Sequence, residues 1–204
     1  MTADPHYWMH LAEVAWIVFV VYWFYSARQL KTVKRREPHA ERIVYIALMA
    51  SAYFLVLNDQ ISVGRLGKRF VPDVPWIGAT GVAITAAGVA LAIWARRHLG
   101  QNWSATVTLK EGHELIRSGP YGRIRHPIYT GMLIAFAGTA LALDEYRGLL
   151  GLAIATSTLF FKAKKEERYL VQEFGDRFQE HIRHTGMFLP SLFHRNDQAH
   201  ANLR

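Results

Sequence analysis

The chain contains no cysteine among its 204 residues. A disulfide bond, a thiolate nucleophile and a cysteine-ligated metal site are therefore excluded. The sequence also lacks internal repeats and low-complexity segments, and its N-terminus has no basic stretch or small-residue cleavage site around the first apolar run. We accordingly expect residues 8–27 to form a retained helix that acts as a plain membrane anchor, not a signal peptide.

Apolar residues, in contrast, make up 51% of the chain and gather in long runs. A helix needs about 20 apolar residues to cross a bilayer. Five segments approach that length, and a chain of this size cannot enclose five such helices in a soluble core. They are residues 8–27, 43–62, 76–95, 127–146 and 147–163. The pattern predicts an all-α integral membrane protein with about five transmembrane helices, a cytoplasmic interfacial loop region and a C-terminal helical extension.

Acidic residues are fewer than basic ones, 16 against 24. A basic excess can indicate nucleic-acid binding, but here 20 of the cationic residues fall on one side of the predicted membrane. The remaining four are Arg65, Lys68, Arg69 and Arg147. This is a strong positive-inside bias. It predicts an external N-terminus, a cytoplasmic C-terminus and contact with membrane lipids but not with nucleic acid.

The most informative junction lies at residues 119–131. Arg125 and His126 stand at the water edge of the fourth apolar segment, and Pro127 starts its helix at a position where a missing N–H costs nothing. Free backbone amides in a first helical turn attract an anion. Two adjacent acids, Glu166 and Glu167, continue the next hydrophobic segment. Such a helix start near paired acids suits a zwitterionic ligand with a carboxylate and an ammonium group.

The third and fourth segments each carry small residues on one helical face. They are Gly81, Thr85, Gly88 and Ala92 in the third, and Gly131, Ala135, Gly138 and Ala142 in the fourth. Small residues at this spacing predict close packing between helices. For Gly131, one turn inside the motif, we leave a second role open, which is to clear room for a ligand.

The fourth and fifth helices meet at Asp144–Gly148, a stretch that allows only a tight hairpin. The two helices should therefore be antiparallel neighbours, which returns Glu166 and Glu167 to the membrane face of His126. We expect the fifth helix to continue to about Phe174. One stripe of it carries Phe160, Ala163, Glu167, Leu170 and Phe174. An acid in such a stripe usually has a partner, which favours a functional role for Glu167. The alternatives are a salt bridge with Arg123 or Arg125 and simple solvation at the interface.

Two further segments carry weaker signals. His181 and His184 have the i, i+3 spacing of metal ligands, but no third ligand accompanies them, so we predict no metal site. Residues 107–109 and 114–116 flank a polar stretch, which indicates a short hairpin or an interfacial loop.

Several sequence blocks together resemble the isoprenylcysteine carboxyl methyltransferase family. The blocks are Gly119-Pro120-Tyr121, Arg125-His126-Pro127-x-Tyr129-x-Gly131, Glu166-Glu167-x-x-Leu170, Phe174-Gly175-x-x-Phe178 and Phe188-Leu189-Pro190. The segment Leu99-Gly100-x-x-Trp103-Ser104 is similar to the short prokaryotic members. The likeness covers roughly residues 94–190, and the Arg-His-Pro and Glu-Glu blocks carry most of its specificity.

The resemblance implies a five-helix enzyme of a prokaryotic inner membrane that uses S-adenosyl-L-methionine in a pocket at the cytoplasmic interface. On this basis residues 1–204 form a single membrane domain. It would contain an N-terminal helix pair (1–63), a cofactor-binding methyltransferase core (76–190) and a flexible tail (191–204).

The resemblance also assigns roles to residues. His126, Tyr129 and Gly131 match the family's cofactor-binding block, and Glu166 and Glu167 match its acidic block. The candidate catalytic residues are Arg125, His126 and Glu167, and the candidate cofactor-binding residues are Tyr121, His126, Pro127, Tyr129, Gly131, Glu166 and Glu167. We hypothesise that Arg125 and His126 hold the cofactor's carboxylate, that the acids hold its ammonium or ribose hydroxyls, and that the tyrosines wall its adenine or sulfonium.

The expected acceptor is lipophilic, foremost the carboxylate of a prenylcysteine-like or related isoprenoid substrate, entering from the lipid between the third to fifth helices. This chain has His184 where the resembling family has an arginine, so the prenylated-protein substrate is not carried over. A thiol or lipid-amine acceptor, which would need His126 or Glu167 as a base, remains an alternative. So do a sterol- or steroid-type membrane reductase using NADPH and a non-catalytic scaffold or carrier. The oligomeric state is left open.

Overall fold

The structure is a computed structural model that describes residues 5–29, 33–35, 39–58, 64–72, 74–100, 109–110 and 115–191. In these ranges the chain forms five long helices and a shorter sixth. They are α1 (Pro5–Ser26), α2 (His39–Leu57), α3 (Pro75–Leu99), α4 (Pro127–Leu143), α5 (Tyr146–Phe174) and α6 (Asp176–His184). Two 3-10 turns, η1 (Ala27–Gln29) and η3 (Gly119–Gly122), and two short strands, β1 (Val33–Arg35) and β2 (Leu109–Lys110), complete the described elements.

Each of the five apolar segments forms a helix, so the predicted all-α membrane architecture is confirmed. By length and composition, α1, α2 and α3 are long and apolar enough to cross a membrane. The fourth, α4, is apolar but has 17 residues. The fifth, α5, is apolar at its start and charged towards its end. The second helix ends at Leu57, before the predicted limit of residue 62, and residues 59–63 lie outside the described ranges.

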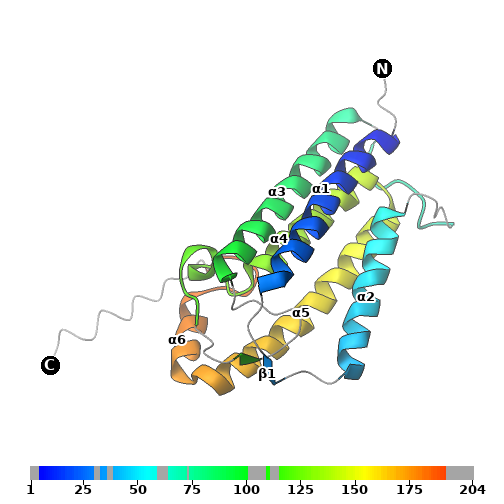
Figure 1. Cartoon of the computed structure of the whole chain (residues 1–204). Helices are drawn as coiled ribbons and strands as arrows, with labels where there is room; N and C mark the ends of the chain where they lie inside the picture. Colours follow the sequence, from blue (N-terminus) through cyan, green and yellow to red (C-terminus); the bar gives the residue numbers. More distant parts are fainter. Residues whose placement is uncertain are drawn as a thin grey trace.

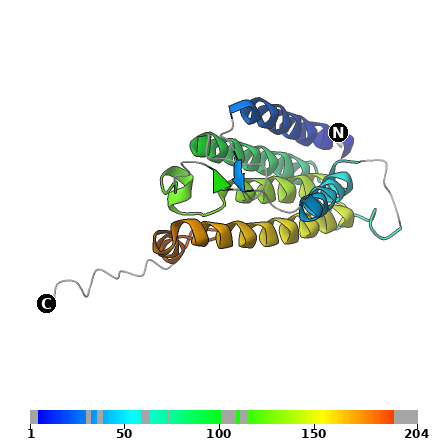
Figure 2. The same ribbon diagram turned by 60° about the horizontal axis from the view of Figure 1, so that its bottom comes forward.

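The helices α1, α3, α4 and α5 follow one another in space, with α3 between α1 and α4 (Figures 1 and 2). The fifth helix returns antiparallel to α4, as predicted, and α2 packs against α5 (Figure 1). The α4–α5 connection is shorter than predicted, because α5 already begins at Tyr146. Asp144 makes the turn in the left-handed conformation, with φ of 60°, which aspartate tolerates better than most residues.

The predicted small-residue faces of α3 and α4 meet at backbone distance. A Cβ atom added to Gly88 would lie 2.4 Å from the backbone nitrogen of Ala135, and one added to Gly131 would lie 2.6 Å from that of Ala92. Gly81 and Gly138 make the same kind of contact further along the helices. The close approach accounts for Gly131 by packing. It also leaves no space for an acceptor between α3 and α4 at these glycines. The expected entry between the third to fifth helices therefore does not include the α3–α4 contact.

Two contacts go beyond what the sequence predicts. In the segment expected to form a short hairpin or an interfacial loop, Leu109 and Lys110 pair antiparallel with Arg35 and Val33 of the connection from α1 to α2, while residues 107–108 and 111–114 lie outside the described ranges. The first helix is more than an anchor, because Trp16 is 3% exposed and its indole N–H donates to Thr139 on α4 at 2.9 Å. Both contacts join segments far apart in sequence, which local patterns do not reveal.

Candidate active site

His126 is the residue immediately before α4, and its side chain is buried. Pro127 occupies the first helical position, where its ring fixes φ and its missing N–H removes no helical bond. The loop before it is held from the C-terminal side, since the His126 N–H donates to the Met187 carbonyl at 3.1 Å. The local sequence and this long-range bond together set the position of the imidazole.

The two acids of α5 face the two nitrogens of this imidazole. His126 Nδ1 lies 3.4 Å from Glu166 Oε2, and His126 Nε2 lies 3.4 Å from Glu167 Oε1. Gly175, with φ of 52°, ends α5 directly after Phe174, as predicted. The predicted meeting of His126 with Glu166 and Glu167 is therefore present in the fold.

Arg125 turns towards Glu167 as well. Its Nε donates to Glu167 Oε1 at 2.7 Å, and its Nη1 donates to the carbonyls of Thr185 and Ile182. One of the alternatives left open for Glu167, the ion pair with Arg125, is thus formed. Glu167 nevertheless also contacts His126, so the ion pair and a site role are compatible. The hypothesis that Arg125 receives a cofactor carboxylate stays a prediction, and the described contacts of its guanidinium are with Glu167 and backbone carbonyls.

Tyr129 completes one wall of the cluster. Its ring stacks parallel to the His126 ring, with centroids 5.4 Å apart, and its hydroxyl donates to Glu166 Oε1 at 2.5 Å. Lys162 Nζ lies 5.8 Å from the centroid of the Tyr129 ring. Aromatic ring, carboxylate and imidazole therefore lie within direct contact of one another.

Two polar atoms near the cluster are buried without a hydrogen-bond partner in the described part of the chain: the Tyr121 hydroxyl and His126 Nε2. The 3.4 Å separation of Nε2 from Glu167 is an ion-pair distance, but the hydrogen-bond geometry is not met. Buried polar groups are nearly always hydrogen-bonded. Two unsatisfied donors in one neighbourhood indicate a place for a polar ligand.

The pKa directions follow from this arrangement. Burial alone lowers the pKa of His126, but the neighbouring Glu166 and Glu167 carboxylates raise it above its usual value. Burial alone raises the pKa of Glu167, yet His126 and Arg125 lower it to about 2. The pKa of Glu166 is lowered by His126, Lys162 and Tyr129 against the effect of its burial. Burial raises the pKa of Tyr121, and the nearby Glu166 charge raises it further. The cluster therefore favours an imidazolium held between two carboxylates.

The remaining candidates lie as follows. Gly131 is one turn further along α4, in contact with α3. In the predicted α5 stripe, Ala163 and Glu167 are buried, whereas Phe160 is 40% exposed. His181 is buried in α6, and burial together with Arg117, Arg125 and His184 lowers its pKa to about 4. In the described part of the chain no group of three potential ligands suits a metal ion.

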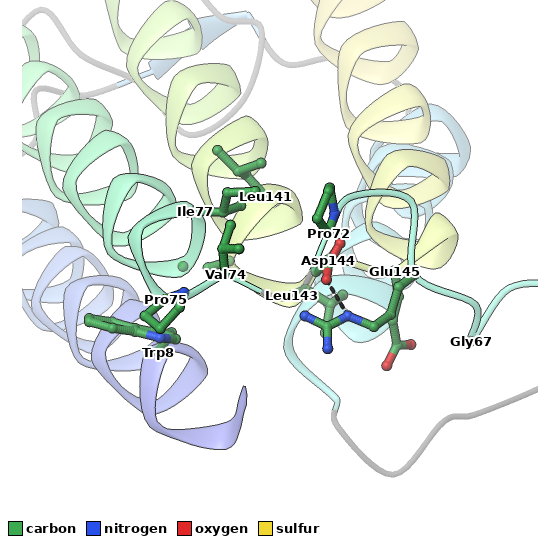
Figure 3. A pocket seen from close by; sticks show the side chains of 13 residues that line it. Trp8, Gly67, Pro72, Val74, Pro75, Ile77, Leu141, Leu143, Asp144 and Glu145 are labelled. Carbon is green, nitrogen blue, oxygen red and sulfur yellow. Dashed lines mark hydrogen bonds and ion pairs between the residues drawn. The ribbon is translucent and has the colours of Figure 1, made fainter. Parts of the chain in front are cut away.

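A pocket lies at the opposite end of the bundle, about 25 Å along α4 from His126 at 1.5 Å per residue. It is lined by Trp8, Pro72, Pro75, Leu141 and Asp144 among others (Figure 3). Its charged members are already paired, since Asp144 accepts bonds from Arg69 Nε and from the Val71 N–H. Hollow shape alone therefore does not mark the chemically active end.

Sequence reasoning missed Thr130 and the backbone of residues 185–188. Thr130 Oγ1 lies 2.8 Å from the Phe188 carbonyl, and the Arg125 N–H donates to the Gly186 carbonyl at 2.9 Å. The closing Phe188-Leu189-Pro190 block was the only signal in the sequence, and it gave no indication of which residues it would touch.

Comparisons with known proteins agree with this arrangement. The sequence pattern of the phospholipid methyltransferase family matches residues 76–177. A nickel-cobalt-cadmium resistance protein of Alcaligenes xylosoxydans xylosoxydans is 26% identical over 59% of this chain and 54% of its own length. A protein-S-isoprenylcysteine O-methyltransferase of Xenopus laevis is 28% identical over 59% of this chain and 43% of its own.

A methanethiol S-methyltransferase of Pseudomonas deceptionensis is 38% identical over 35% of this chain and 27% of its own length. The chain spans about half the length of the first of these relatives. The family match covers α3 to α5 and so includes His126, Tyr129, Glu166 and Glu167, and the resemblance to isoprenylcysteine methyltransferases is confirmed. This chain belongs to the phospholipid methyltransferase family.

Proposed function

We propose that this protein transfers a methyl group from S-adenosyl-L-methionine to a lipophilic acceptor, and that the transfer takes place at His126, Glu166 and Glu167. The observation that carries the proposal is the buried Glu167 carboxylate and the partly buried Glu166 carboxylate, which face the two nitrogens of one buried imidazole. His126 Nε2 and the Tyr121 hydroxyl are buried there without a hydrogen-bond partner in the described part of the chain. Paired acids that hold one cation suit an ammonium group. Unsatisfied donors suit the carboxylate or hydroxyl oxygens of the same ligand.

The donor set fits the cofactor group by group. Glu166 and Glu167 would hold its ammonium or ribose hydroxyls. The Tyr121 hydroxyl and His126 Nε2 would donate to its oxygens, helped by the free amides of the first turn of α4. We propose that Arg125 orients Glu167 and takes no direct part in binding.

When bound, S-adenosyl-L-methionine supplies a methyl group already activated by a positively charged sulfur. The protein then contributes mainly alignment and exclusion of water. The Tyr129 ring favours a neighbouring cation by roughly 0.5–2 kcal/mol. The two carboxylates raise the pKa of His126, and the imidazole between them fixes both acids in position.

The candidate acceptors differ in whether a base must remove a proton from them before the methyl group is transferred. A carboxylate acceptor is already a nucleophile, so a prenylcysteine-like or related isoprenoid carboxylate needs no proton removed. A thiol acceptor requires a base within reach, and Glu167 is the ionised candidate. A lipid-borne acceptor would approach from the side of α4 that faces α5, since the α3–α4 contact is closed.

We propose that this cluster lies at the cytoplasmic face of a prokaryotic inner membrane, with the N-terminus outside. The unequal distribution of positive charge along the sequence supports this orientation. The cysteine-free chain allows a direct test, because single introduced cysteines report which side they face. Labelling of a Ser191→Cys variant by an impermeant reagent from outside intact cells would contradict this orientation.

The decisive experiment compares ligands on purified protein in detergent. We expect S-adenosylhomocysteine to raise the melting temperature and NADPH to leave it unchanged. The reverse result would favour the membrane-reductase alternative, and no response to either would favour a scaffold or carrier. Incubation with a labelled methyl donor and native lipid extract would then identify the acceptor by its labelled product.

The role of Glu167 is tested by calorimetry with S-adenosylhomocysteine. Hydrogen bonds to charged groups are worth about 1.5–3 kcal/mol, so Glu167→Gln should weaken binding by roughly 10- to 100-fold. Glu173→Gln is the matched control, because Glu173 is an exposed acid on the same helix. Equal affinity in the Glu167→Gln variant and the wild type would exclude Glu167 from the binding site.

A further inference from the structure

Residues 185–190, here called the C-terminal strap, cross the loop that carries Arg125 and His126. The strap lies beyond residue 177, where the family match ends. Ile124 and Gly186 form a parallel bridge, and the Gly186 N–H donates to the Arg123 carbonyl at 3.2 Å. The strap therefore runs beside the loop as a short extra strand.

Every residue of the loop from 123 to 126 is tied to the strap or faces it. The Arg125 and His126 N–H groups donate to the carbonyls of Gly186 and Met187 at 2.9 and 3.1 Å. The Arg125 guanidinium donates to the Thr185 carbonyl. The strap thus fixes both the backbone of the histidine and the arginine that holds Glu167.

Side chains reinforce this backbone frame. The Phe188 ring meets the His126 ring edge-on, with centroids 6.3 Å apart, while Tyr129 stacks on the same imidazole. The imidazole therefore has two aromatic neighbours, one from α4 and one from the strap. Its orientation between Glu166 and Glu167 depends on both.

Thr130 joins the strap to the first turn of α4. It is buried, and its hydroxyl lies 2.8 Å from the Phe188 carbonyl and 3.2 Å from the His126 carbonyl. A hydroxyl carries one proton, so it donates to the nearer carbonyl, that of Phe188. A bond to the residue four back is common for threonine in helices, but the bond to Phe188 spans 58 positions.

We infer that the C-terminal strap, latched by Thr130, is a positioning element that orients His126 for cofactor binding, and that Thr130 and Gly186 are positioning residues of this site. The inference rests on the proposed function, because it assigns the strap to the same cofactor site. Gly186 is needed because a Cβ there would lie 1.8 Å from the Leu189 carbonyl oxygen, so the turn of the strap would have to open.

The test uses full-length Thr130→Val, which keeps the shape of the side chain but removes its hydroxyl, and Gly186→Ala. We expect Thr130→Val to weaken S-adenosylhomocysteine binding by about fivefold, the effect of one hydrogen bond, and Gly186→Ala to weaken it at least as much, because the added Cβ forces the strap to shift. Amide exchange at Arg125 and His126 should accelerate by a similar factor. Thr130→Ser retains the hydroxyl and should restore the wild-type values.

Thr156→Val is the matched control, since Thr156 is an exposed threonine of α5 whose hydroxyl donates to the carbonyl four residues back and not to the strap. It should change neither binding nor exchange at residues 125 and 126. Wild-type binding in both Thr130→Val and Gly186→Ala would overturn the role of the strap and leave the proposed function intact. Failure of the wild-type protein itself to bind would overturn both.

Discussion

The two ends of α4 both bury charged side chains, but only one end satisfies them completely. At the Leu143 end, Arg147 is 1% exposed and donates to Glu145 at 2.5 Å and to the carbonyls of Leu55 and Asn58. At the Pro127 end, Tyr121 and His126 each retain a buried polar atom without a hydrogen-bond partner in the described part of the chain.

This difference separates buried polar groups that the fold satisfies from those that it leaves for the proposed ligand. Arg147 ties the end of α2 to the start of α5, and its bonds close that end of the bundle. A native fold does not leave buried donors unsatisfied without a reason. The pocket in Figure 3 lies at the satisfied end, so the state of the polar groups identifies the site better than the shape of the surface does.

The largest effect is expected from Arg147→Met. Removing one partner of a buried charge network costs about 3–5 kcal/mol, here because Glu145 and the α2 carbonyls lose their donor. The loss is measured as the difference in the free energy of unfolding between Arg147→Met and the wild type, both purified in detergent. Glu180→Gln is the control, since that pair with Arg117 is exposed and worth under about 1 kcal/mol.

Affinity for S-adenosylhomocysteine in the folded fraction of Arg147→Met should stay at the wild-type value, because the change lies at the other end of α4. A drop in affinity comparable to that of Glu167→Gln would mean that the two ends are coupled, and the comparison would fail.

A smaller effect with an unusual sign is expected from Tyr121→Phe. An unsatisfied buried polar group costs about 1–3 kcal/mol, so removing the hydroxyl should leave the melting temperature unchanged or raise it. The same change should weaken S-adenosylhomocysteine binding by about fivefold, since the ligand oxygen then loses the donor that the Tyr121 hydroxyl would provide. Lower stability with unchanged affinity would show that the Tyr121 hydroxyl has a structural partner and no ligand role.

The smallest expected effect is the change in the free energy of unfolding with pH. The folded pKa of His126 is raised, so its contribution is complete below the unfolded pKa of about 6.5 and is lost as the pH rises through the folded value. The folded pKa of Glu167 is lowered to about 2, so its contribution is present above the unfolded value and is lost as the pH falls towards 2.

The cluster therefore stabilises the fold most between about pH 4.5 and 6.5. Chemical unfolding measured from below about pH 4.5 to above about pH 6.5 follows the loss of stability on both sides. His126→Gln should remove the loss on the alkaline side while leaving the Glu167–Arg125 pair. If the stability of His126→Gln still falls as the pH rises above about 6.5, that loss belongs to another group.

Much of the fold was predictable because helical periodicity is local. The five apolar segments became α1 to α5, the glycine faces of α3 and α4 meet, and α5 ends at Phe174. The meeting of His126 with the paired acids was also predictable, because a short α4–α5 turn permits only an antiparallel return. The β1–β2 pairing was not, since its partners lie on either side of α2 and α3.

The site was predictable in membership but not in its internal bonds. The sequence placed Arg125 with the ligand-binding groups, whereas the structure directs it to Glu167 and the strap. It counted Arg147 among the charges of an external loop, whereas that side chain is almost completely buried. In both cases the partner depends on how neighbouring helices are rotated and on loops that close over long distances.

The sequence by itself determined that this chain folds into membrane helices and that an imidazole, two carboxylates and a helix start converge on one face, because apolar length and helical spacing leave few alternatives. Only the tertiary structure decided which charges neutralise one another and which buried donors are left for a ligand. The reason is geometric. A hydrogen bond forms only when donor and acceptor are placed to within a few tenths of an ångström, and here they lie on segments that share no local sequence pattern.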